Sequence, residues 1–333
     1  SDGLALVASP SDGALQAARA AWIDAREWYG TTEVFRFHDT PIDVEGGPEA
    51  YINSWPLDEQ YIDYVADLAN GGAPLLVGIV NQPELYGDVT RDALIALNQP
   101  QEVGETAVAT GYHAIEFLLW GQDLYADTAG RRAFADFVDG DGPGRPDRRR
   151  AYLTVVDDLL VDDLQGVVDA WGPYRDTLAT RAVDEALLGV LTGMGSLAGA
   201  ELSGERMQVA WDSQSQEDEH SCFSDNTHRD VVRDIEGLRA VWGGRYERAD
   251  GSVVEGPSLA DVVASADPAL ADRTTADLDA AVEAAEQIRR FDQDIQSEDG
   301  RVIIKAVIDA LGVVTGDVVD AADALGLRLN LEG

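Results

Sequence analysis

Long stretches of this chain repeat apolar residues every three or four positions, which is the spacing of one face of an α-helix. Two such stripes, in residues 178–202 and 302–325, are long enough for extended helices. The same spacing predicts further helices at 14–36, 57–69, 90–98, 102–120, 148–171, 227–242 and 269–294. Alternation of apolar and polar residues, which would indicate strands, is rare. The pattern therefore predicts an all-α protein built from bundled helices.

The clearest interruption of the helical pattern lies at residues 139–147, where glycines and prolines cannot continue a helix. The chain has 333 residues, which exceeds the usual size of a single hydrophobic core. We therefore expect two helical-bundle domains, at 10–138 and 147–330, joined by a linker at this break.

A glycine-rich apolar run at residues 187–200 spaces four glycines so that another helix can approach its backbone closely. The run is shorter than the roughly 18 to 20 apolar residues that a membrane-spanning helix needs. We expect it to pack tightly inside a bundle, and we expect no transmembrane segment.

The charge of the chain limits its partners. Asp and Glu number 62 against 24 Lys and Arg, which gives a net charge of −38, and Lys305 is the only lysine. Such a surface repels nucleic acid and anionic membranes and concentrates cations, so nucleic-acid binding is not expected. The single cysteine, Cys222, rules out an internal disulfide and is interpreted as a small buried apolar residue. Four arginines are interpreted mainly as surface salt bridges, although they could also neutralise surplus carboxylates or hold an anion that binds together with iron: Arg36, Arg206, Arg229 and Arg233.

Two distant segments each contain a histidine and a glutamate three positions apart, His113 with Glu116 and Glu217 with His220. Residues at this separation are neighbours on the surface of a helix, so each pair is predicted to share a helix face. The chain has only 4 histidines, and two of them are placed in this way. If the two segments meet in the folded chain, their side chains could hold one metal ion.

Imidazole and carboxylate donors favour iron, manganese or zinc, whereas a structural zinc site would recruit several thiolates. The stretch around residues 216–228 adds further donors. Ordinary alternatives remain open: His113 could be salt-bridged within the core, and the second stretch could be an acidic loop that ends in a helix cap. The predicted metal ligands are His113, Glu116, Glu217, His220 and Asp225, with Glu33 and His228 as weaker candidates.

The sequence Gly111-Tyr-His113-Ala-Ile-Glu116 resembles the G-x-H-x-x-E motif of the imelysin family. Residues 29–37, 52–58 and 216–228 resemble the iron-regulated protein A branch of that family, and the similarity extends over about residues 10 to 325. The resemblance implies an exported protein of two helical bundles in the periplasm or cell envelope, with its signal removed and a lipid anchor conceivable. It also implies a role in iron acquisition, with His113 and Glu116 at the positions proposed to bind metal in the family.

Three functions follow as hypotheses. The first is a periplasmic iron-binding protein for iron uptake, with iron as the bound metal. The alternative is a zinc metallopeptidase, which the family name implies, although the chain lacks the H-E-x-x-H motif that would supply ligands and a base. The third is an interaction protein without its own metal, which docks a membrane transporter or a redox partner.

Overall fold

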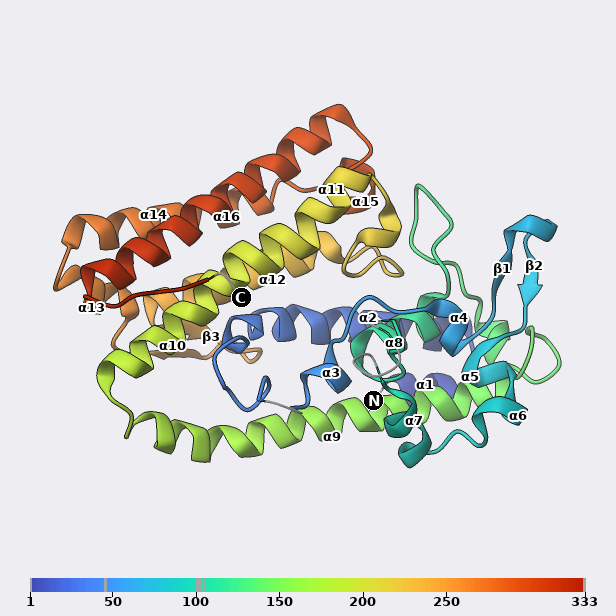
Figure 1. Cartoon of the computed structure of the whole chain (residues 1–333). Helices are drawn as coiled ribbons and strands as arrows, with labels where there is room; N and C mark the ends of the chain where they lie inside the picture. The colour runs from blue at the N-terminus through green and yellow to red at the C-terminus, as the bar shows by residue number, and fades with distance from the viewer. Residues whose placement is uncertain (1, 45–46, 100–103, 105, 332–333) are drawn as a thin grey trace. The chain divides into compact units, whose positions relative to one another are not determined.

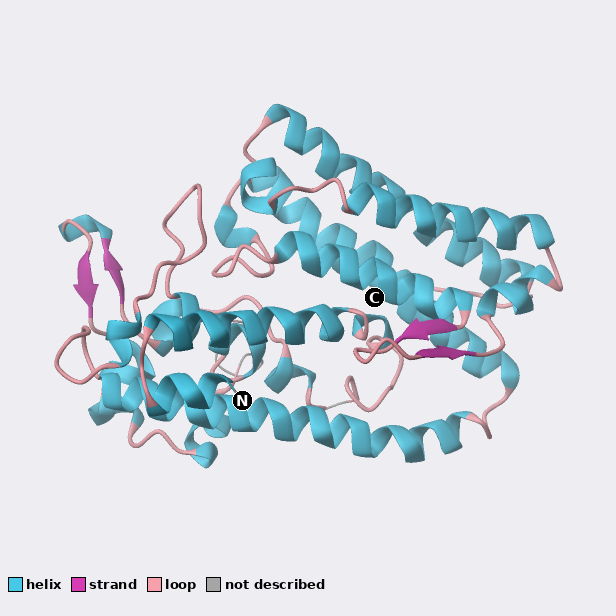
Figure 2. Cartoon of the chain, turned by 180° about the vertical axis from the view of Figure 1, so that it is seen from behind, coloured by secondary structure: helices cyan, strands magenta, loops and turns pink. Residues whose placement is uncertain are grey.

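The computed structural model describes residues 2–44, 47–99, 104 and 106–331, and helices dominate this part of the chain (Figure 1). The strands form two short antiparallel hairpins, β1 with β2 and β3 with β4, drawn in magenta in Figure 2. They pair Val65–Asp67 with Ala73–Leu75 and Arg245–Glu247 with Val253–Glu255. The predicted all-α class is confirmed.

The chain divides into two compact units, and each is interrupted in sequence. Ser1–Asp24 and Gly46–Ala170 form the first unit, while Ala25–Glu45 and Trp171–Gly333 form the second. The predicted linker at residues 139–147 lies within the sequence range of the first unit. The predicted division at 10–138 and 147–330 stays a prediction.

The first unit contains mostly short helices around a buried central helix, α8. Trp22 of α2 donates its indole N–H to the Tyr112 carbonyl of α8 at 2.9 Å, and Tyr152 of α9 donates to the Ala109 carbonyl just before α8 at 2.9 Å. The elements that contribute to this unit are α1 Asp2–Ala8, α2 Asp12–Gly30, α3 Glu49–Ile52, α4 Glu59–Ile62, η2 Leu68–Asn70, α5 Gly78–Asn81, α6 Pro83–Tyr86, α7 Arg91–Leu97, α8 Gly111–Trp120, η3 Phe134–Phe137 and α9 Pro146–Leu178. Helices α2 and α9 begin in this unit and end in the second one.

The second unit is a bundle of longer helices. Its elements are η1 Glu33–Phe35, α10 Val183–Ser196, the π-helical η4 Leu197–Gln208, α11 Val209–Ser213, η5 Gln216–Asp218, α12 Thr227–Gly243, α13 Leu259–Ala264, α14 Pro268–Ala285, α15 Phe291–Asp294 and α16 Glu298–Ala324. Helix α16 packs against α14 and α10, and α12 packs against α14. The long stripes predicted at 178–202 and 302–325 correspond to α10 with η4 and to α16.

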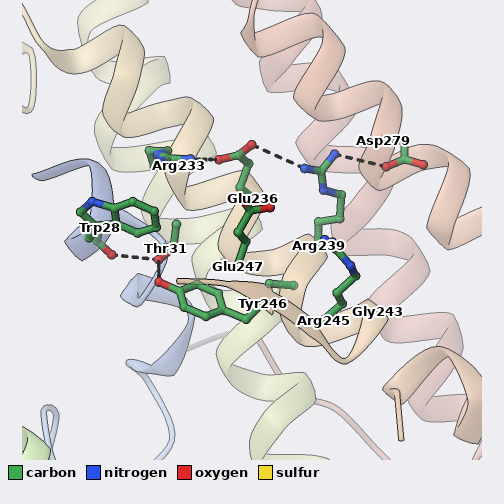
Figure 3. Close-up of a pocket in the computed structure, with 11 residues that line it drawn as sticks. Trp28, Thr31, Arg233, Glu236, Arg239, Gly243, Arg245, Tyr246, Glu247 and Asp279 are labelled. Carbon is green, nitrogen blue, oxygen red and sulfur yellow. Dashed lines mark hydrogen bonds and ion pairs between the residues drawn. The ribbon is translucent and has the colours of Figure 1, made fainter. Parts of the chain in front are cut away.

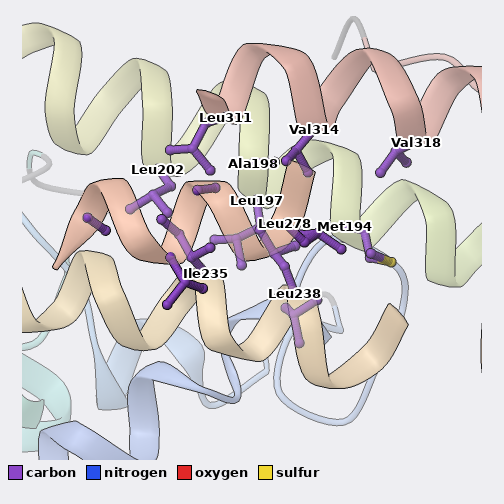
Figure 4. Packing of buried hydrophobic residues seen from close by; sticks show 14 of the residues in the cluster. Met194, Leu197, Ala198, Leu202, Ile235, Leu238, Leu278, Leu311, Val314 and Val318 are labelled. Atoms are coloured by element: carbon purple, nitrogen blue, oxygen red, sulfur yellow. The ribbon is translucent and has the colours of Figure 1, made fainter. Parts of the chain in front are cut away.

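The core of the second unit lies between these helices (Figure 4). It contains fully buried apolar side chains from α10, η4, α12, α14 and α16: Met194, Leu197, Ala198, Leu202, Ile235, Leu238, Leu278, Leu311, Val314 and Val318. A Cβ placed on Gly199 would lie 3.1 Å from Thr315 of α16, and one on Gly193 would lie 2.9 Å from the Val34 carbonyl. The glycine-rich run therefore permits close packing, as its spacing predicts.

The helices predicted at 14–36, 57–69, 102–120 and 269–294 are wrong in extent, and the first of them ends at Gly30 as α2. Residues 57–69 form α4 and then enter the first hairpin, because Asp63 is extended and the Asp67 carboxylate accepts the Asn70 N–H at the turn. The helix predicted at 102–120 begins only at Gly111, and residues 102–103 and 105 lie outside the described part of the chain. The helix predicted at 269–294 is broken after Ala285, before α15.

One described helical run, Val183–Ser213, is long and apolar enough to cross a membrane, with a mean hydropathy of 1.3 in its most apolar window. The glycine-rich run at 187–200 is only part of this longer helix. Because Leu191, Met194 and Leu202 of this helix are fully buried in the second unit, its apolar character fits a core helix equally well.

Candidate functional site

Helix α8 is held in place by its first residue. Gly111 has φ +86°, and a Cβ at this position would lie 2.4 Å from the Ile52 carbonyl oxygen at the end of α3. Only glycine combines this backbone conformation with such a close approach. Just before the helix, the buried Asn98 side chain accepts the backbone N–H groups of Ala109 at 2.7 Å and Thr110 at 3.3 Å. The start of α8 is therefore fixed on both sides.

All ten residues of α8 are buried, including the histidine and the glutamate of the motif. The Nδ1 atom of His113 lies 2.9 Å from Oε2 of Glu116, and neither side chain is exposed to solvent. The Trp55 ring lies 4.9 Å from the His113 ring, between centroids. The predicted pairing across one helix face is confirmed. Because Glu116 engages Nδ1, a metal bound to His113 would be bound through Nε2.

The second predicted pair is arranged differently, and the prediction that Glu217 and His220 share a helix face is wrong. The 3₁₀ turn η5 ends at Asp218, and Glu219 has extended backbone angles. Glu217 is exposed, whereas His220 is 4% exposed and Glu219 is fully buried. The polar residues around η5 offer no apolar face that would extend the turn into a helix. Glu219, which was not selected from the sequence, is therefore the buried carboxylate beside His220.

The turn that contains His220 is hydrogen-bonded to α12. Ser221 donates its hydroxyl to Asp230 Oδ2 at 2.5 Å, and its backbone N–H to the Thr227 hydroxyl at 3.0 Å. Asp230 also accepts from Arg26 at 3.3 Å. Cys222 is 3% exposed, as its interpretation as a small apolar residue predicts. The turn is therefore built on buried polar contacts.

The other predicted donors of this stretch already have protein partners. Asp225, at φ +58°, forms an ion pair with Arg290, which also binds Asp292 at 2.6 Å. The Nδ1 atom of His228 lies 3.1 Å from the Asp225 carbonyl oxygen, and burial lowers the pKa of this imidazole. Their roles as ligands stay predictions.

Glu33, a weaker candidate ligand, belongs to a buried ion network in the second unit. Arg206 contacts Glu33 at 2.5 Å, Glu201 at 2.7 Å and Asp234 at 3.1 Å. Arg36 adds contacts to Glu33 at 3.1 Å and Glu201 at 3.3 Å. The interpretation of Arg206 as a surface salt bridge is wrong, because this side chain is only 5% exposed.

Three carboxylates of this network, Glu33, Glu201 and Asp234, are paired with Arg206, and Arg36 pairs with two of them. Burial acts to raise the pKa of Glu33, but Arg206 and Arg36 outweigh it and lower the pKa to about 2. Burial raises the pKa of Asp234 well above its usual value.

A complete metal site is not evident in the described part of the chain, which contains no group of three or more His, Cys, Asp or Glu side chains suitably placed for a metal ion. The donor types of the buried residues, imidazole nitrogen and carboxylate oxygen, are nevertheless those that iron accepts. The chemistry of the donor set fits iron, and the ligand assignments stay predictions.

Two solved structures show the same fold as this chain. One is described as an iron-regulated protein A precursor from Parabacteroides distasonis; it has 16% sequence identity and a TM-score of 0.68, and the match covers 97% of this chain and 86% of that one. The other, an imelysin-like protein from Psychrobacter arcticum 273-4, has 14% identity and a TM-score of 0.60, with coverage of 99% and 90%. No curated protein matches the chain.

The sequence provides the family assignment. The family model described as Imelysin matches residues 3–317, which is nearly the whole chain. This range includes α8 with its G-x-H-x-x-E motif and the turn that contains His220. The chain belongs to the imelysin family.

Proposed function

We propose that this protein is an exported, cell-envelope protein that binds iron and takes part in iron uptake. The fold similarity to a protein described as an iron-regulated protein A precursor supports both the link to iron and the export. The net charge of −38 also supports the link to iron, because an acidic surface raises the local concentration of cations.

The observation that carries the proposal is the buried His113–Glu116 pair. Removing an imidazole and a carboxylate from water is unfavourable, and a metal ion is one of the few partners that compensate for it. A carboxylate that accepts from one ring nitrogen of a histidine fixes the orientation of the ring, so that the other nitrogen can bind a metal. Glu116 would then orient His113, in addition to any direct role as a ligand.

In the second unit, burial ranks the candidate donors. His220 and Asp225 are buried, whereas Glu217 is exposed and is the weakest of the five predicted ligands. Glu219, which is buried next to His220, joins the candidates. The proposal requires that His113 and His220 bind the same iron ion.

Iron binding by single-histidine variants tests this requirement. Metal-free protein is equilibrated with iron under anaerobic conditions and desalted, and bound iron is counted by elemental analysis. Wild-type protein should retain one iron, and His113→Ala and His220→Ala should each lose most of that iron on desalting. The control is His38→Ala, which removes a half-buried histidine whose Nδ1 lies 2.8 Å from the Arg36 carbonyl oxygen.

The stoichiometry distinguishes a shared centre from separate ones. Loss of the same single iron in both variants supports the proposal. If wild-type protein bound two irons and each variant lost one of them, the shared centre would be excluded. Equal iron content in His113→Ala and His38→Ala would exclude His113 as a ligand.

A further inference from the structure

A cavity of about 650 Å³ lies in the second unit, and none of the predicted metal ligands lines it (Figure 3). Its walls come from the end of α2, from α12, from β3 and from α14. Among the residues that line it are three arginines, Arg233, Arg239 and Arg245, and three carboxylates, Glu236, Glu247 and Asp279. Its volume falls within the range of sites that bind small organic molecules.

Close backbone packing forms one wall of this cavity. A Cβ on Gly30 would lie 2.9 Å from Cβ of Arg233, and a Cβ on Gly237 would lie 2.6 Å from the Thr31 carbonyl oxygen. These two glycines allow the end of α2 to lie directly against α12. The Thr31 hydroxyl then lies 3.2 Å from the Tyr246 hydroxyl, which connects α2 to β3.

Arginine is unusually frequent in this cavity. Three of its eleven lining residues are arginines, in a chain that has only 24 basic residues among 333. Arg233 is neutralised by short ion pairs to Glu27 at 2.7 Å and Glu236 at 2.5 Å. The same lining contains three carboxylates, and two of them, Glu236 and Asp279, are paired with these arginines.

The other two arginines have only long ion pairs or none with described residues. Arg239 reaches Glu236 and Asp279 only at 3.5 Å each, and it is 43% exposed. Arg245 is exposed and forms no ion pair with another described residue within 4.0 Å. An arginine can hold a carboxylate through two parallel hydrogen bonds. Arg239 belongs to α12 and Arg245 to β3, and both line the same cavity.

We propose that this cavity binds a small organic polycarboxylate, with its carboxylates on Arg239 and Arg245 and its carbon skeleton near Trp28 and Tyr246. Both aromatic residues line the cavity in Figure 3, and they provide the apolar contact area that an inorganic anion would not use. None of the predicted iron ligands lines this cavity, so the proposal can be tested independently of the proposed iron binding.

Calorimetric titration with propane-1,2,3-tricarboxylate tests the proposal. This probe has three carboxylates and no hydroxyl group, and the protein is first freed of metal on a chelating resin so that no soluble chelator competes. Arg239→Gln and Arg245→Gln should each weaken binding by roughly tenfold, since each removes one charge-assisted contact. The matched control, Arg248→Gln, removes one positive charge from the loop after β3 without changing the cavity lining.

A second pair of variants tests the cavity without changing its charge. Gly243 lines the cavity, and a Cβ at this position would meet no atom within 4 Å, so Gly243→Phe should fill the space and abolish binding. Gly312→Phe is the control, because Gly312 of α16 has equally free space and lies outside the cavity. Thermal unfolding verifies that each variant is folded.

Three results would overturn the proposal. The first is the absence of tricarboxylate binding up to 10 mM, a ceiling of roughly −3 kcal/mol in binding free energy. The second is equal binding by wild-type protein and both arginine variants. The third is binding of acetate or inorganic phosphate with the same affinity as the tricarboxylate, which would show a general anion site.

Discussion

The two histidine–glutamate segments have the same spacing but different structures. His113 and Glu116 face each other on a fully buried helix, whereas Glu217 and His220 are separated by the end of a 3₁₀ turn and by an extended residue. The first segment is surrounded in sequence by apolar residues such as Ile115, Phe117 and Leu118. The second follows acidic and polar ones. Spacing therefore predicts a shared helix face only where apolar neighbours favour a helix.

The two segments are also held by different forces. Close backbone packing and apolar burial fix α8, since Gly111 contacts Ile52 and every residue of the helix is buried. Buried polar groups fix the turn around His220, through Ser221 and Asp230. Helix α12, which contains Asp230, also contributes Asp234 to the ion network of Arg206. Adding a side chain at a closely packed glycine should therefore destabilise the first segment most. Changes in pH should destabilise the second segment most.

The largest effect is expected from Gly111→Ala. The new Cβ would lie 2.4 Å from the Ile52 carbonyl oxygen, in a backbone conformation that side chains disfavour. Strain and overpacking together should lower the free energy of unfolding by about 3 kcal/mol or more. Urea unfolding followed by tryptophan fluorescence measures this. Gly166→Ala is the control, because a Cβ on Gly166 of α9 would meet no atom within 4 Å. Equal midpoints for the two variants would show that α8 is not fixed by backbone packing.

Low pH should lower the stability of the second unit because Glu33 becomes protonated. Its pKa is about 2 in the folded chain against an ordinary value of 4.5, so its stabilising effect is complete above about pH 4.5 and is lost as the pH falls toward 2. The difference corresponds to about 3 kcal/mol. In Glu33→Gln, this contribution is already lost at pH 7, and stability should fall less steeply between pH 5 and 2.

Asp234→Asn provides the control for this pH dependence. Because burial raises the pKa of Asp234, deprotonation of this group is unfavourable in the folded chain, and its presence lowers stability as the pH rises above about 3.8. The asparagine variant should therefore keep the acid sensitivity of Glu33 while losing stability less at higher pH. Parallel pH profiles for wild-type protein and Glu33→Gln, measured by urea unfolding, would contradict the role of Glu33.

Much of the fold could be predicted from the sequence because apolar periodicity reports directly on helices that pack in a core. The stripes at 178–202 and 302–325 and the helix at 227–242 appear close to their predicted positions. The hairpins could not be predicted in this way. The segment after Ile62 is extended because local carboxylates bind backbone N–H groups at the turn, and such contacts leave no periodic pattern.

The candidate site was predictable in part. The His113–Glu116 pair follows from helical spacing in an apolar segment. The burial of Glu219 could not be recognised, because an acidic stretch gives no sign of which carboxylate points inward. The ion network of Glu33 and Arg206 joins residues 173 positions apart, and only the folded chain brings them together. The cavity around Arg239 was missed for the same reason, since its residues come from four elements.

The smallest effect is expected at the glutamate of the second pair, and it gives the most direct comparison of the two segments. Glu217→Gln should change the free energy of unfolding by less than about 0.5 kcal/mol, since Glu217 is exposed. The same exchange at Glu116 replaces a charge-assisted bond to a buried histidine and should cost about 1 to 3 kcal/mol. Urea unfolding of both variants at pH 7 provides the measurement. If the two substitutions had equal effects, the two pairs would be energetically equivalent in spite of their different structures. Burial could then no longer be used to rank Glu217 below the other predicted ligands.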